Sequence, residues 1–95
     1  MLACKIIGQA ISTVKDKRLK GYTMLVVGRV DCVSGQVLDQ FIALDNLGAG
    51  EGEVVGVIQG TPAQDTLGLE GVPVDAVVVA IFDSLSMGGK EVYKK

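Results

Sequence analysis

The sequence predicts an all-β protein that folds as a small five-stranded barrel with one short helix and associates with other copies of itself. The pattern is strand-like along almost the whole chain, and residues 2–14 place apolar side chains on one face with the period of two that a strand shows. Glycine-containing turns separate the apolar stretches at short intervals, as in small barrels and sandwiches. Several stretches are apolar on both faces, although no long helical pattern is available to cover a second face.

The first two strands are expected at residues 2–14 and 22–31, on either side of a charged loop at 15–21. In the first strand, one face carries the apolar side chains of Leu2, Cys4, Ile6, Ala10 and Val14. The second strand is rich in β-forming residues. Its predicted core face carries Tyr22, Met24, Val26 and Val30.

Three more strands are expected in the rest of the chain. They cover residues 37–44, with Phe41 and Leu44, then 53–59 and 76–85. The segments between them are a turn at 33–36, a glycine-rich loop at 45–52 and a Gly/Pro-containing loop at 67–73. Thr61 is a suitable N-cap and Pro62 suits the first helical position, so a short helix is expected at 60–65. The polar tail at 88–95 is expected to add a short edge strand, and the whole predicts an OB-like barrel.

The composition fits one small domain that hides apolar surface by association. A chain of 95 residues forms a single domain, residues 1–95, and a domain of this size buries only about two-thirds of its unfolded surface. Apolar residues nevertheless make up 48% of the chain, and the mean hydropathy is +0.42. The stretches 76–82, 24–27 and 54–58 are apolar on both faces, whereas a monomeric barrel should be polar outside. We therefore expect other subunits to cover the outer faces.

Catalysis and metal or cofactor binding find no support in the composition. The chain has no histidine, which removes the commonest general base and the commonest metal ligand. The spacing of the acidic residues singles out no pair for acid–base work, and no serine or cysteine has an obvious base. We expect a protein that is not an enzyme and that carries no cofactor and no metal.

Nucleic-acid binding is the alternative function. The net charge is −2 and the sequence pI is about 4.9, whereas nucleic-acid binders carry a basic excess. A basic group is present at Lys15, Lys17, Arg18 and Lys20, and OB folds often bind single strands through a basic groove with exposed aromatic side chains. Only Tyr22 lies nearby, on the predicted core face, so a solvated loop is favoured and no nucleic-acid partner is expected.

The two cysteines, Cys4 and Cys32, are too few for a disulfide scaffold. A hairpin of the first two strands would bring them near each other, but two buried reduced thiols in a cytoplasmic protein are the favoured interpretation.

The N-terminus lacks the charged and apolar regions of a signal peptide. The longest apolar run, 76–82, is too short to span a bilayer, so no membrane partner is expected.

The glycine-rich loop Gly48-Ala49-Gly50-Glu51-Gly52 does not fit a nucleotide site. A dinucleotide fingerprint needs a third glycine and a following helix, whereas position 53 is Glu and a strand follows. We expect a tight connection with φ > 0 at the glycines and close approach of the backbone to a neighbouring chain. Asp45 before this loop and Asp75 after Pro73 are expected to accept backbone N–H bonds as turn residues.

Four segments of the sequence carry a resemblance to a known family. They are Gly8-Gln9 with Ser12-Thr13-Val14-Lys15, Leu19-Lys20-Gly21 with Met24-Leu25-Val26-Val27, residues 43–55 from Ala43-Leu44-Asp45-Asn46 through the glycine-rich loop, and residues 73–83 from Pro73-Val74-Asp75-Ala76 to Asp83. In this order and with these gaps they resemble the EutN/CcmL family of bacterial microcompartment vertex proteins, which includes PduN-like members. The glycine-rich loop together with the Pro-Val-Asp strand is the most specific part.

This resemblance implies an OB-like barrel that forms a homopentameric ring, with a hexameric ring as the alternative. The ring would cap the vertices of a polyhedral shell around enzymes in the bacterial cytoplasm, with hexameric shell proteins as partners. Six positions are expected to shape the subunit contacts: Asp45, Gly48, Ala49, Gly50, Pro73 and Asp75. The family usually has a Gly-Ser-x-Ala-Arg-like run where this chain has Gly60-Thr61-Pro62-Ala63-Gln64, which puts an ion pair of that arginine in doubt.

Overall fold

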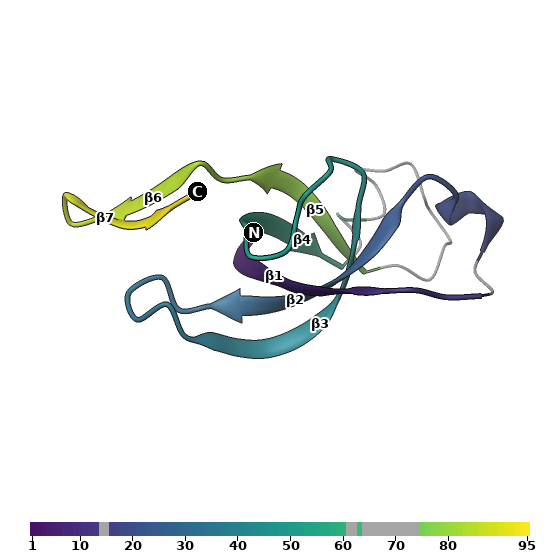
Figure 1. The fold of residues 1–95 in the computed structure, drawn as a ribbon, viewed down its shortest axis with the longest axis horizontal. Coiled ribbons are helices and arrows are strands. Elements are labelled where there is room, and N and C mark those ends of the chain that lie inside the picture. Colours follow the sequence, from purple (N-terminus) through teal and green to yellow (C-terminus); the bar gives the residue numbers. More distant parts are fainter. Residues whose placement is uncertain (14–15, 61–62, 64–74) are drawn as a thin grey trace.

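The computed structural model describes residues 1–13, 16–60, 63 and 75–95 of the chain. Five strands form a closed barrel: β1 (Leu2–Ala10), β2 (Thr23–Val30), β3 (Val37–Asp45), β4 (Val54–Gln59) and β5 (Ala76–Ile81). A short 3-10 helix, η1 (Lys17–Leu19), lies between β1 and β2, and the chain ends with β6 (Ser84–Met87) and β7 (Lys90–Lys94). The prediction of an all-β, five-stranded barrel is confirmed (Figure 1).

The barrel follows the order β1-β2-β3-β5-β4 and is antiparallel except at one junction. The strands β3 and β5 run parallel and pair at a single position, where Leu44 meets Val77. The strand β1 pairs with β2 on one side and with β4 on the other, and an irregularity between Ile6 and Gly8 shifts its register against β2. Such bulges bend a strand and increase its twist, which closing a small barrel requires.

The core fills the barrel with small and branched apolar side chains. Its buried members are Cys4, Ile6, Leu25, Val27, Ala43, Val55, Val57, Ala76 and Val78. The prediction that Met24 and Val26 face the core is wrong, because Leu25 and Val27 point inward instead. Both faces of this strand are apolar, so the sequence pattern could not indicate which face points into the barrel.

A second apolar cluster lies outside the barrel, beside the charged loop. Leu19 and Leu44 are buried there, with Tyr22 and Met24 packed against them. The charged residues Lys17, Arg18 and Lys20 are exposed, in agreement with the solvated loop favoured above, whereas η1 turns Leu19 onto the barrel. Asp16 caps this turn by accepting a hydrogen bond from the backbone N–H of Arg18, with 2.9 Å between the two atoms.

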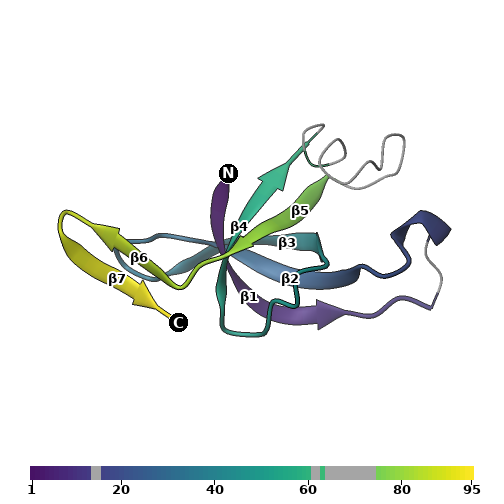
Figure 2. The same cartoon turned by 90° about the horizontal axis from the view of Figure 1, so that it is seen from above.

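The predicted fifth strand at 76–85 divides into two strands. The strand β5 ends at Ile81, and the chain then leaves the barrel and forms the hairpin β6–β7, a separate two-stranded sheet. Gly88 and Gly89 make its tight turn, both with positive φ. The tail therefore pairs with the end of the predicted fifth strand, whereas we expected it at an edge of the barrel. Figures 1 and 2 show this hairpin, called the arm below, projecting from one end of the barrel.

The structure answers two further expectations differently. The predicted helix at 60–65 lies largely outside the described residues, of which Ala63 is one and is buried. The turn at 33–36 is confirmed: the backbone N–H of Asp31 donates to the carbonyl oxygen of Gln36, and Gly35 has a φ of 76°. Within the described ranges, no helix has the length and apolar character needed to cross a bilayer.

Candidate functional site

Asp45 organises the loop between β3 and β4. Its side chain is buried, and its carboxylate oxygens accept hydrogen bonds from the backbone N–H groups of Leu47, Gly48 and Ala49, at 3.1, 3.2 and 3.0 Å. Asp45 is the only buried charged or polar residue among those the structure describes. A buried carboxylate is tolerated when several N–H donors replace its water. The prediction that Asp45 acts as a turn residue is confirmed.

The rest of this loop is held against its own barrel. Ala49 packs on the core, and the N–H of Gly52 donates to the carbonyl of Ile6 at 2.8 Å. Gly48 and Gly52 have φ values of 84° and 89°, as predicted, whereas Gly50 does not adopt positive φ. The loop therefore presents a fixed shape to whatever contacts it.

Glu53 connects this loop to the C-terminus. One carboxylate oxygen accepts the backbone N–H of Gly50, and the other lies 2.9 Å from the ammonium nitrogen of Lys95. The hydrogen bond from Gly50, followed by that from Lys95, lowers the pKa of Glu53 below its ordinary value. We did not identify Glu53 or Lys95 from the sequence, because no local pattern indicates that residues so far apart meet.

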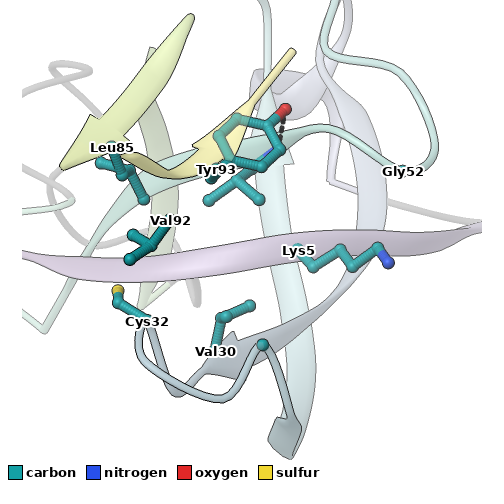
Figure 3. Close-up of a pocket in the computed structure, with 9 residues that line it drawn as sticks. Lys5, Val30, Cys32, Gly52, Leu85, Val92 and Tyr93 are labelled. Carbon is teal, nitrogen blue, oxygen red and sulfur yellow. Dashed lines mark hydrogen bonds between the residues drawn. The ribbon is translucent and has the colours of Figure 1, made fainter. Parts of the chain in front are cut away.

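A mostly apolar cavity of about 160 Å³ lies between the barrel and the arm (Figure 3). Its lining comprises Lys5, Val30, Cys32, Gly35, Gly52 and Val54 from the barrel side and Leu85, Val92 and Tyr93 from the arm. The Tyr93 hydroxyl accepts a hydrogen bond from the backbone N–H of Val54 at 3.2 Å. The cavity is thus the place where the base of the arm is seated on the barrel.

The two thiols lie in different surroundings and form no disulfide. Cys4 is buried in the core, and this burial, with a smaller effect from the charge of Asp39, raises the pKa of its thiol to about 11. A thiol of that kind stays protonated and unreactive near neutral pH. Cys32 is partly exposed at the cavity, so the expectation of two buried thiols is correct for Cys4 and wrong for Cys32.

The outer face of β1, β2 and β3 carries an apolar strip. Gly8 pairs with Val26, and Val26 pairs with Ile42, so the three residues line up across neighbouring strands on one face. The side of Ile42 that faces away from the barrel is open, since this residue is 46% exposed. A polar side chain is the usual occupant of such a position on the outside of an antiparallel barrel. The exposed apolar side chain of Ile42 therefore makes this strip a candidate contact surface.

The predicted contact residues are only partly brought together. Asp45, Gly48, Ala49 and Gly50 form one rigid loop, as described above. Asp75 lies apart from it and is exposed, and its carbonyl oxygen accepts the N–H of Gly60 at 2.7 Å. Pro73 lies outside the described residues. The structure gives no subunit contact for any of the six positions, so their role in contacts stays a prediction.

The basic loop lacks the features of a single-strand binding groove. The guanidinium of Arg18 is engaged by Asp16, with 2.8 Å between Nη2 and Oδ2. Tyr22 packs against the outer cluster of Leu19 and Leu44, so its ring is not fully presented for stacking on a base. Within the part of the chain that the structure describes, no three Cys, Asp or Glu side chains are grouped to hold a metal ion.

Comparison with known proteins gives the same family at the levels of sequence and structure. Residues 1–83 match the sequence profile of the family described as ethanolamine utilisation protein EutN/carboxysome. The carboxysome shell vertex protein CcmL of Nostoc sp. is 39% identical over 97 aligned positions, which cover 100% of this chain and 95% of that protein.

Two solved structures extend the likeness to the fold. An ethanolamine utilization protein EutN superposes with a TM-score of 0.91 at 32% identity, covering 100% of this chain and 99% of the other. A structure described as the pentameric microcompartment shell protein GrpN of Rhodospirillum rubrum superposes with a TM-score of 0.78 at 33% identity, covering 92% of this chain and 100% of that one. The agreement extends along the whole barrel, and the chain belongs to the EutN/CcmL family of microcompartment shell vertex proteins.

Proposed function

We propose that this protein is a structural subunit of a bacterial microcompartment shell, and that five copies form a ring that caps a vertex of the shell around enclosed enzymes. The full-length match to proteins named as shell vertex proteins carries this proposal. The GrpN relative, described as pentameric, supports the number of subunits. The CcmL and GrpN relatives are named as shell proteins rather than enzymes, and these names lend no support to single-strand binding.

A closed polyhedral shell requires a five-fold ring at each vertex. Six-fold tiles alone make a flat sheet, and a closed polyhedron needs five-fold units at its corners. A five-fold ring must use head-to-tail contacts, in which two different surfaces of each subunit meet. We infer that hexameric shell proteins surround the ring, and that the protein is located in the microcompartment shell within the bacterial cytoplasm.

The apolar strip of Gly8, Val26 and Ile42 is the surface that we assign to the contact between subunits. Burial of a large apolar side chain contributes about 1.5–3 kcal/mol, so even a few such positions at each contact add up around a ring. The loop of Asp45, Gly48, Ala49 and Gly50 adds a rigid element to that contact, with Leu47 49% exposed at its surface. Pro73 and Asp75 are proposed to shape the same contact.

Native mass spectrometry of the purified protein tests this function. We expect a dominant species of five subunits, and we expect the Ile42→Lys variant to shift the distribution towards monomers because it places a charge in the strip. The matched control is Thr13→Lys, which adds the same charge at an exposed polar position beyond the end of β1 and should leave the ring intact. A monomeric wild-type protein would overturn the proposal, and a hexamer would keep the shell role while removing five-fold capping.

A further inference from the structure

Among the described residues, the hydrogen bonds that join the arm to the barrel lie at its base. The N–H of Phe82 donates to the carbonyl of Val54 at 3.0 Å, and the N–H of Lys95 donates to the carbonyl of Asp83 at 2.8 Å. The hydroxyl of Tyr93 also accepts a hydrogen bond from the backbone N–H of Val54 in β4. Beyond this base, the arm projects away from the barrel in both views of the molecule (Figures 1 and 2).

The outer half of the arm lacks the cover that a two-stranded sheet needs. Hairpins of two strands are marginally stable in water unless they pack on something else. Ser86, Met87, Lys90 and Glu91 are all exposed, and Met87 presents 47% of its surface although it is apolar. The strands β6 and β7 pair only with each other among the described residues, so each also offers one unpaired edge.

The strand β3 offers a second unpaired edge on the barrel itself. Its neighbour on that side is β5, but the two strands pair only where Leu44 meets Val77. From Val37 to Ala43, the described residues provide β3 with ladder partners from β2 alone. Unpaired N–H and C=O groups along a strand are a template for pairing with another chain. Leu38 beside this edge is 37% exposed.

We propose that the arm of each subunit lies along the free edge of β3 in the neighbouring copy and fastens the ring. This inference rests on the ring of the proposed function and names the surfaces that close it. In Figure 1 the arm leaves the barrel at the end where the β2–β3 turn lies, and its base shares the cavity with Val30, Cys32 and Gly35. The arm forms a separate sheet and does not pair with β3 of its own subunit. The two surfaces are also different, which is what a head-to-tail contact in an odd-numbered ring requires.

Cross-linking between introduced cysteines tests this contact. The background is Cys32→Ser, which removes the partly exposed thiol and leaves the buried Cys4. The variant Ser86→Cys with Gln40→Cys places one thiol on the arm and one beside the β3 edge, both at exposed positions. With a short bismaleimide, denaturing electrophoresis should show a ladder that reaches five linked chains. Each subunit is linked to one neighbour through the cysteine on its arm and to the other neighbour through the cysteine beside its β3 edge.

The matched control joins the arm to a position outside the proposed contact. The variant Ser86→Cys with Thr13→Cys should give no ladder, since residue 13 lies beyond the far end of β1. Five-subunit rings in native mass spectra without a ladder for Ser86→Cys with Gln40→Cys would overturn the arm contact and leave the proposed function standing. An equal ladder in the control would also overturn it. Absence of rings in the wild-type protein would instead refute the proposed function.

Discussion

Replacement of Asp45 by alanine tests whether one buried carboxylate holds the loop between β3 and β4. The side chain accepts three backbone N–H groups and is 3% exposed. A hydrogen bond to a charged group contributes about 1.5–3 kcal/mol, and a buried N–H left without a partner costs about 1–3 kcal/mol. Leu47 and Gly48 are exposed, so their N–H groups can turn to water, whereas Ala49 is partly buried and has less access to water.

Because water compensates for two of the three bonds, we expect Asp45→Ala to lower the free energy of unfolding by about 3 kcal/mol. For a domain of this size that change lowers Tm by about 12–24 °C, at roughly 4–8 °C for each kcal/mol. Thermal unfolding followed by circular dichroism measures this, at one fixed protein concentration because ring assembly shifts Tm by mass action. The control is Asp83→Ala, which removes an exposed carboxylate. A loss for Asp45→Ala within about 0.5 kcal/mol of the loss in that control would refute the role of the carboxylate.

Three further changes test other parts of the structure. Gly28→Ala places a Cβ against Cγ1 of Val37 and should cost about 1–3 kcal/mol of stability; addition of Val37→Ala should restore most of it, and no rescue in chemical denaturation would contradict the close approach. Iodoacetamide at pH 8 should modify Cys32 and spare Cys4, whose pKa is raised to about 11; two labels by mass spectrometry would disprove this. The lowered pKa of Glu53 stabilises the fold above pH 4.5, its ordinary value, and this contribution is lost as the pH falls through the folded-state pKa. The Tm difference between wild type and Glu53→Gln should therefore shrink on acidification, and a difference that stays constant would count against the contribution.

Local chemistry explains which parts of the fold could be predicted from the sequence. The strand at residues 37–44 was predicted to within a residue of the observed Val37–Asp45, because a turn at 33–36 and the glycine-rich loop at 45–52 bound its apolar residues on both sides. The hydrogen-bonding role of Asp45 followed from the preference of Asp for accepting nearby N–H groups. Both depend on residues that are close in the chain.

The missed features depend on how distant parts of the chain meet. The apolar pattern at 76–85 hid the point where β5 ends at Ile81 and the chain leaves the barrel. Phe82 is still held on the barrel, because its N–H pairs with Val54 of another strand, and the chain departs after it. The inward face of β2 was assigned wrongly because Leu25 and Met24 are both apolar. The ion pair of Glu53 with Lys95 joins the loop to the last residue of the chain, and no periodicity indicates such a pair.

The sequence by itself determined the class of fold, the order and approximate positions of the barrel strands and, through its apolar excess and its likeness to the EutN/CcmL family, the assembly role. These properties arise from period-two alternation, turn chemistry and composition, which are carried by neighbouring residues. Only the tertiary structure decided which apolar face fills the barrel and which forms the outer strip around Val26 and Ile42. It also decided that the last residues form an arm and that the edge of β3 from Val37 to Ala43 has no second partner among the described residues. Strand pairing makes these choices, because closing a sheet depends on the registers of all its strands at once.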